Sequence, residues 1–152
     1  MIHNAITNEI MKKINFLAIV FFIHLFFMSS GFAAKSNYFD EGKTLFDKKE
    51  FEKSKILFQR DIVFNPKSEK SYLYLAKIFK QNKNEEEQEI NLDNVLLLNP
   101  QNEEAIYMLT ILKIKQSDYK KAKELKEKFA LICESFCSKK SEIEKSFNKL
   151  TP

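Results

Sequence analysis

The sequence contains little glycine, proline or histidine and no tryptophan. It has 2 glycines, 3 prolines and 2 histidines among 152 residues. Sheets with many turns use glycine and proline heavily, so this scarcity argues against an all-β fold and favours long helices joined by short connections. Hydrophobic residues make up 44% and charged residues 30%, which is typical of a globular chain rather than a disordered one. We therefore expect a single helical domain.

The same shortages limit the chemistry that the chain can perform. General acid–base and nucleophilic catalysis depend largely on histidine, and both histidines, His3 and His24, lie within the first 34 residues. A loop that cradles phosphate needs several glycines, and Gly42 is the only one beyond residue 34. We predict no enzymatic activity, no metal and no cofactor, although a hydrolase that uses carboxylates alone stays open.

Nucleic acid is not expected as a partner. Arg60 is the only arginine, so an arginine cluster for binding phosphate is not available. The lysines of residues 120–128 could form a basic patch, but Glu124 and Glu127 interleave with them. With a formal net charge of +4, this segment indicates an ordinary charged helix surface.

The N-terminal segment has the three parts of an export signal. Lys12 and Lys13 form a basic start, and an apolar run follows over 16–28. Small residues come next and include Ala33 and Ala34. This order is typical of a secretory signal peptide. The apolar run is about 13 residues long, which is short of the ~20 that a membrane-spanning helix needs.

We therefore predict that residues 1–34 are a signal peptide, removed after Ala33 or Ala34. The protein would then be periplasmic or secreted, with a bacterial origin, and would contact the membrane only before cleavage. An uncleaved membrane anchor is the alternative. Residues 11–13, Met-Lys-Lys, resemble a natural start, which would make residues 1–10 an extension of the true chain.

The rest of the chain repeats itself. Asn65-Pro66 and Asn99-Pro100 are 34 residues apart, and the segments that end on them align without a gap. Tyr38 falls on Tyr72, and Gly42 falls on Ala76. A fixed period of this length indicates stacked repeat units. The units expected are 35–68, 69–102 and 103–136.

Each unit is predicted to contain two helices. In the second unit an apolar face at i, i+3, i+4 and i+7 marks the first helix, and a facing stripe marks the second. These residues are Tyr72, Leu75, Ala76 and Phe79, then Leu92, Val95 and Leu96.

Capping signals mark where these helices begin and end. Asn84 with Glu87 resembles a capping box, and each Asn-Pro pair ends a helix, because the residue before proline is disfavoured in the α region. Ser68 and Asn102 stand where an N-cap is needed for the next unit.

A 34-residue helix–turn–helix period resembles the tetratricopeptide repeat (TPR) family over residues 35–136. Gly42 and Ala76 match the small residue where the two helices of that repeat pack closest. The resemblance implies an all-α, right-handed α-solenoid of three TPR units. A plain antiparallel helix bundle is the alternative. Residues 137–152 are expected to cap the last hydrophobic face, with Ser141 and Glu144 as a capping box and an apolar stripe at Ile143, Phe147 and Leu150.

Several residues depart from the pattern of the family. Asp61 stands where a small or apolar residue is usual, and Lys113 and Lys126 stand at positions that are normally apolar. Glu134 replaces the proline that ends the first two units. The third unit is therefore expected to be adapted to the segment that follows it.

Cys133 and Cys137 are the only cysteines and are spaced C-x3-C. After export an even pair predicts a disulfide, which would pin the third unit to the capping helix. A redox-active pair and two free thiols are alternatives, whereas zinc would need about four ligands. Small exported bacterial TPR proteins often end with such a C-x3-C, followed six residues later by an apolar residue, and Ile143 occupies that place.

In the TPR family the first helices of successive units line a concave groove that holds a partner. The groove positions implied here combine apolar side chains with lysines, which would suit an extended or helical peptide with some acidic character. They are Phe39, Lys43, Phe46, Lys70, Leu73, Lys77, Lys80, Tyr107 and Ile111. The same side chains could instead be covered by a neighbouring helix or by a second copy of the chain.

The most specific function predicted is thus an exported TPR adaptor that holds a protein or peptide partner in its groove. A structural subunit that self-associates, or docks into a cell-envelope assembly, is the second hypothesis. A thiol-redox factor that uses the cysteine pair is a distant third. The resemblance argues against the carboxylate-clamp role that some TPR domains have, because Phe39, Tyr74, Glu104 and Met108 occupy positions that such a clamp needs.

Overall fold

The computed structural model describes residue 11 and residues 37–149. The predicted signal peptide therefore lies outside the described residues, apart from Met11. The described chain contains a short 3₁₀ helix, η1, and seven α-helices and no strand. In order they are α2 (Tyr38–Asp47), α3 (Phe51–Phe64), α4 (Glu69–Gln81), α5 (Glu85–Leu98), α6 (Glu103–Lys115), α7 (Tyr119–Ile132), η1 (Cys137–Lys139) and α8 (Lys140–Asn148).

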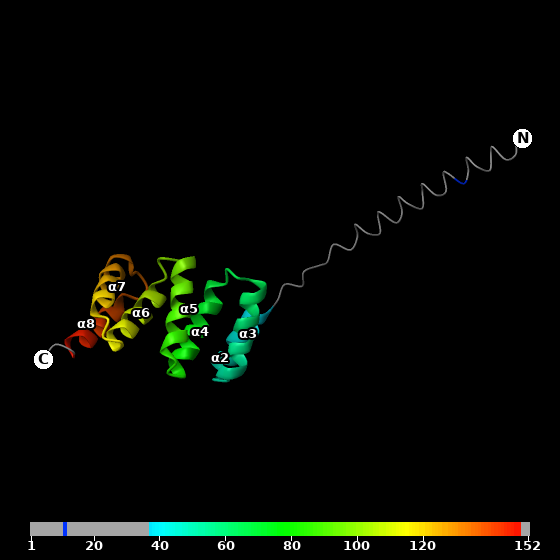
Figure 1. Ribbon diagram of the computed structural model, residues 1–152, viewed down its shortest axis with the longest axis horizontal. Coiled ribbons are helices and arrows are strands. Elements are labelled where there is room, and N and C mark those ends of the chain that lie inside the picture. The colour runs from blue at the N-terminus through cyan, green and yellow to red at the C-terminus, as the bar shows by residue number, and fades with distance from the viewer. Residues whose placement is uncertain (1–10, 12–36, 150–152) are drawn as a thin grey trace, which may run out of the picture. The chain divides into compact units, whose positions relative to one another are not determined.

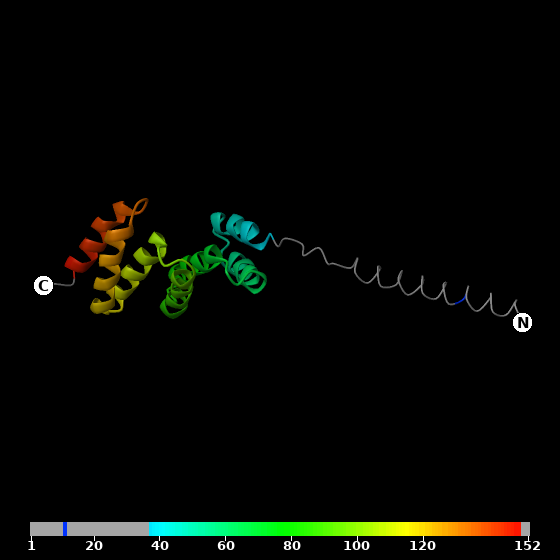
Figure 2. The same cartoon turned by 90° about the horizontal axis from the view of Figure 1, so that it is seen from above.

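The helices form three hairpins that stack in chain order. Figure 1 shows α2 and α3, then α4 and α5, then α6 and α7, with α8 at the C-terminal end. The view from above in Figure 2 shows the same progression along the stack. Each hairpin packs on the next through its second helix, so that α3 contacts α4 and α5 contacts α6. The prediction of an all-α solenoid of three helical hairpins with a C-terminal capping helix is confirmed.

A left-handed residue closes each hairpin turn. Lys49, Lys83 and Ser117 have φ values of 64°, 56° and 62°, and they are spaced by the 34-residue period. In the first turn the N–H of Lys49 donates to the carbonyl of Phe46, and the next N–H donates to the carbonyl of Leu45. These are the two bonds of a Schellman motif, which usually places glycine at the left-handed residue. Because none of the three is glycine, composition alone gave no signal for this turn.

Asparagine and aspartate cap three of the helices. The side chain of Asn84 accepts from the N–H of Glu87 at 3.2 Å, and Asn102 accepts from the N–H of Ala105 at 2.8 Å. Asp118 caps α7 in the same way. These bonds confirm both predicted asparagine caps. Ser68 is the N-cap residue of α4, as predicted, but its hydroxyl donates to Ser71 Oγ at 3.0 Å and accepts no hydrogen bond from a backbone N–H of the helix.

The core of the described residues consists of two clusters along the stack. Leu92 and Val95 on α5 and Ala105 and Ile106 on α6 are fully buried, so the middle and last hairpins share one cluster. A second cluster centres on Phe58, Leu75 and Ile78, between the first hairpin and α4. The apolar stripes predicted from the sequence therefore form the contacts between units.

Two buried polar contacts replace apolar packing at the start of the stack. Ser54 Oγ donates to the carbonyl of Gly42 at 2.8 Å, which ties α3 to α2. Asp61 is 4% exposed and accepts from Ser71 Oγ at 2.5 Å. A buried carboxylate is costly without a partner, and the first residues of α4 supply one. This contact explains how an aspartate fits where the repeat normally has a small or apolar residue.

The capping helix packs on α6 but begins differently from the prediction. Ile143 is buried and Phe147 packs against the same core, as the apolar stripe predicted, while Leu150 lies outside the described residues. The capping box at Ser141 and Glu144 is wrong, because η1 runs directly into α8 and places Ser141 inside the first turn. Glu144 pairs instead with Lys126 at 2.6 Å, so this lysine at a normally apolar position meets a charge on the cap. Within the part of the chain that the structure describes, no helix is both long and apolar enough to cross a membrane.

Candidate partner-binding surface

The predicted groove residues lie on α2, α4 and α6, the first helices of the three hairpins. We call this surface the first-helix face. Its N-terminal part is an aromatic cluster in which Tyr74 of α4 meets two rings of α2. The ring of Phe39 lies 5.7 Å from that of Tyr74, and the ring of Phe46 lies 5.0 Å from it, both edge to face. Such pairs have preferred geometries and bury apolar area, so α2 and α4 present an apolar surface of half-buried rings.

Lysines border this aromatic cluster. Lys70 Nζ lies 5.9 Å from the centre of the Phe39 ring, and Lys77 Nζ lies 4.8 Å from that of Tyr74. Lys77 also pairs with Glu104 of α6 at 2.9 Å. Lysine over an aromatic face is held by a cation–π interaction. The first-helix face therefore combines rings with positive charge.

The remaining two lysines of the set are exposed. Lys43 Nζ pairs with Asp47 at 2.7 Å, and the hydrogen bond to this carboxylate raises the pKa of Lys43. Lys80, at the other end of the set, lies near enough to Glu142 of α8 to help lower the pKa of that carboxyl, after the larger contributions of Lys139 and Tyr107. The positive charges thus run from α2 along α4 toward the cap.

Leu73 and Tyr107 are buried rather than free, at 9% and 7% exposure. Helix α8 covers the end of α6, where Tyr107 donates a hydrogen bond to Glu142 at 2.5 Å and Lys139 lies 5.2 Å from its ring centre. Burial, followed by Glu142, raises the pKa of Tyr107. The expectation that these two side chains are open to a partner does not hold in this structure, because the neighbouring helices cover them. Ile111 is partly buried and packs against the same core.

The segment between α7 and α8 is fixed by the cysteine pair and by a carboxylate. The Sγ atoms of Cys133 and Cys137 lie 2.13 Å apart, a disulfide distance. Glu103, at the start of α6, accepts from the N–H of Glu134 at 3.0 Å and from that of Phe136 at 2.7 Å. The bond from the Phe136 N–H, together with the neighbouring N–H groups, lowers the pKa of Glu103. Sequence reasoning missed this residue.

The repeat period offered a signal for it. Glu69 stands 34 residues before Glu103 and accepts hydrogen bonds from Asn99, at 3.1 Å, and from Asn102. In both units a glutamate at the first position of the first helix accepts hydrogen bonds from the C-terminal end of the same unit. In the third unit Glu103 accepts from backbone N–H groups, because no Asn-Pro pair ends that unit.

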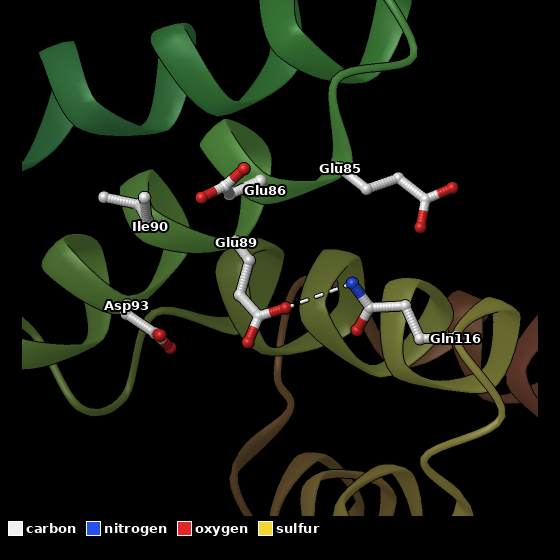
Figure 3. Close-up of a pocket in the computed structure, with 6 residues that line it drawn as sticks. All are labelled: Glu85, Glu86, Glu89, Ile90, Asp93 and Gln116. Atoms are coloured by element: carbon white, nitrogen blue, oxygen red, sulfur yellow. Dashed lines mark hydrogen bonds between the residues drawn. The ribbon is translucent and has the colours of Figure 1, made fainter.

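A surface hollow of about 540 Å³ lies beside α5. Figure 3 shows its lining, which is mostly acidic and includes Gln116 at the end of α6. The residues are Glu85, Glu86, Glu89, Ile90, Asp93 and Gln116.

The pKa values of two carboxyls in this hollow are shifted in opposite directions. The hydrogen bond from Lys113 lowers the pKa of Glu89, which also accepts from Gln116 at 3.1 Å. Burial, followed by the charge of Glu89, raises the pKa of Asp93. Among the described residues no group of three or more histidine, cysteine, aspartate or glutamate side chains could hold a metal ion. We interpret the hollow as a charged surface.

Comparison with known proteins points to one fold. No sequence-family profile and no curated protein matches the chain. Solved structures do. The first TPR domain of Spaghetti (RPAP3), bound to the HSP90 peptide SRMEEVD, superposes with a TM-score of 0.69 and 13% identity, over 80% of this chain and 100% of that one.

Two further TPR domains are similar. The Sgt2 TPR domain from Aspergillus fumigatus gives a TM-score of 0.64 at 20% identity, over 78% of this chain and 80% of that one. The C-terminal TPR-containing domain of an FK506-binding protein from Plasmodium falciparum gives 0.65 at 21% identity, over 75% and 86%. The chain therefore has the fold of a TPR domain, and its repeat units are TPR hairpins.

Proposed function

We propose that this protein is an exported adaptor that holds a segment of another protein on its first-helix face. The observation that carries the proposal is the lysine-bordered aromatic cluster on α2 and α4. Aromatic anchors in a partly desolvated surface supply most of the energy of a typical interface. The lysines around them favour a partner with acidic groups.

The likeness to other TPR domains supports this use of the face. The TPR domain of Spaghetti binds an HSP90 peptide whose sequence, SRMEEVD, is rich in acidic residues. The present chain has Phe39, Tyr74, Glu104 and Met108 at positions that a clamp for a terminal carboxylate would need. We therefore propose an internal or helical segment that pairs acidic with apolar side chains.

The same proposal includes export of the protein. It also includes oxidation of Cys133 and Cys137 to a disulfide after export. The support is the order of basic, apolar and small residues over 1–34, together with a cysteine pair at disulfide distance. In an oxidising compartment the bond would fix the segment that leads into α8. Edman sequencing of the protein recovered from the periplasm or medium of expressing bacteria tests this part, since we expect the mature chain to start at residue 34 or 35.

Co-purification with charge-reversed variants tests the binding proposal. Lys70 and Lys80 are exposed and belong to the first-helix face, whereas Lys67 is exposed in the loop before α4. We expect the double variant Lys70→Glu, Lys80→Glu to reduce the recovery of the bound partner at least about tenfold, the equivalent of ~1.4 kcal/mol. Lys67→Glu, the matched control, should leave recovery unchanged. Equal recovery with all three proteins would overturn the proposal.

A further inference from the structure

The second helices of the hairpins carry exposed apolar side chains at repeated positions. Val63, Leu97 and Leu131 follow one another at the 34-residue period and are 76%, 80% and 87% exposed. Ile56 and Ile90 lie seven residues earlier on α3 and α5 and are 49% and 47% exposed. Residues seven apart share one face of a helix. We call these five residues the outer ladder.

The outer ladder is not part of the core that holds the hairpins together. Helix α5 is anchored by Gln88, Asn91, Leu92 and Val95, and α7 by Ala122, Leu125 and Phe129. An isolated exposed leucine is common and needs no explanation. Here the same outward position is apolar in all three units, although outward positions of amphipathic helices are normally polar. Repetition of that kind indicates a surface used for contact.

The charges beside the outer ladder are mainly acidic at the start of α5 and mainly basic at the start of α7, although Glu85 and Glu89 pair with Lys115 and Lys113 of α6. Helix α5 begins with the acidic side chains that line the hollow in Figure 3, among them Glu86 and Glu89. Helix α7 begins with Lys120, Lys121 and Lys123, all exposed, and the exposed Glu124 that follows them pairs with Lys121 at 3.5 Å. A partner of one charge sign, such as nucleic acid or an anionic lipid surface, would be attracted by one of these helix starts and repelled by the other. A second copy of this chain presents both.

We propose that two copies of the chain dock through the outward faces of α5 and α7, with α5 of each copy against α7 of the other. Glu86 and Lys120 are separated by the repeat period, and so are Leu97 and Leu131. A single two-fold rotation therefore brings Leu97 against Leu131 of the second copy and Glu86 against its Lys120. The same rotation places Ile90 beside Glu124 of the second copy, so Leu97 and Leu131 make the apolar contact of this pairing. Each contact occurs twice, as an isologous interface requires. The first-helix face stays open, so this inference does not depend on the proposed function.

The mass of the protein in solution tests the pairing. The full chain, as expressing bacteria accumulate it, is examined by sedimentation equilibrium over a range of concentrations. We expect a dimer, and we expect Leu97→Glu and Leu131→Glu each to raise its Kd at least ~30-fold, as for a residue at the centre of an interface. Gln59→Glu places the same charge on α3, at an exposed residue outside the outer ladder, and should change the Kd by no more than about twofold.

Because Leu97, Leu131 and Gln59 are exposed, circular dichroism should show unchanged helicity in each variant. A wild-type protein that stays monomeric at every concentration would overturn the proposal. So would a dimer that survives Leu97→Glu, or one that Gln59→Glu weakens as much as Leu97→Glu does.

The charge pairing has its own test. Glu86→Lys and Lys120→Glu should each weaken the dimer about tenfold, since each places like charges opposite one another. The double variant exchanges the two signs and should restore a Kd within about twofold of the wild-type value. Additive weakening in the double variant would show that these residues do not face each other, and would overturn the α5-to-α7 arrangement.

Discussion

The two ends of the stack differ in how their first helices are buried. Helix α2 buries only Gly42, whereas α6 buries eight residues. They are Ala105, Ile106, Tyr107, Met108, Leu109, Thr110, Leu112 and Ile114. Helix α6 is covered by α5, by α7 and by the capping helix, while α2 packs mainly on α3. In a stack where each unit contacts only its neighbours, the uncovered end is the least stable part.

This difference bears on the proposed function. The exposed first hairpin carries Phe39 and Phe46, whose rings are only half-buried, and the covered last hairpin carries Tyr107, which is buried. Binding surfaces are commonly drawn from the less stable parts of a fold. We therefore expect the N-terminal half of the first-helix face to change conformation most readily when a partner binds. Helix α6, packed between its neighbours and α8, should keep its conformation.

The sharpest test of this contrast compares equivalent truncations at the two ends. Leu109→Ala removes a side chain that is 2% exposed, and we expect it to lower the free energy of unfolding by about 2–5 kcal/mol. Leu45→Ala, on the half-buried α2, should cost less than half as much, because part of its surface already faces water. Urea unfolding followed by circular dichroism measures both. Equal losses would show that the two ends are equally packed.

Gly42→Ala tests a close contact between α2 and α3 in the first hairpin. A Cβ at this position would lie 2.9 Å from Cε1 of Phe58 and 3.3 Å from Cβ of Leu57. Phe58 is fully buried and cannot move aside, so we expect a loss near the upper end of the ~1–3 kcal/mol typical of overpacking. The pair Gly42→Ala, Phe58→Leu should cost less than the sum of the single changes. Strict additivity in thermal unfolding would contradict this explanation.

Removing the disulfide should lower the stability of the C-terminal end of the stack, where α6 is packed against α8. The double variant Cys133→Ser, Cys137→Ser opens a short loop, so we expect a loss of about 2 kcal/mol, the low end of the usual range. Dithiothreitol should lower the Tm of the wild-type protein toward that of the variant and leave the variant unchanged. A wild-type Tm that does not respond to full reduction would show that the bond contributes nothing to the cap.

The smallest effect concerns pH and Glu103. Because N–H groups of residues 134–136 lower its pKa in the folded state, the carboxylate contributes stability above its unfolded pKa of about 4.3. That contribution is lost as the pH falls through the lowered, folded pKa. Glu103→Gln should thus be less stable than wild type at pH 7, and the gap should close in acid. Glu127→Gln, an exposed control on α7, should show no such trend in Tm against pH.

Most of the fold could be predicted because the same weak helix and turn signals recur at the 34-residue period. The Asn-Pro pairs, the apolar faces and the caps at Asn84 and Asn102 all followed from the period and were confirmed. The hairpin turns were missed although Lys49, Lys83 and Ser117 keep the same period, because residue type alone does not reveal a left-handed conformation.

The candidate surface was less predictable, since burial depends on what the neighbouring elements cover. The resemblance to the TPR family implied groove positions for Leu73 and Tyr107, yet both side chains are buried in this structure. The role of Glu103 depends on backbone N–H groups about 30 residues away, which side-chain patterns do not encode. Whether the remaining lysines and rings bind a partner stays a prediction.

In-cell photo-crosslinking from position 80 tests the central claim most directly. Lys80 is exposed on the first-helix face, so a photoreactive side chain there changes no core contact. We predict one dominant adduct with a foreign protein, which Lys70→Glu abolishes. Adducts only with the chain itself would contradict the account, because they would show that the first-helix face is a contact between copies rather than a surface for another protein.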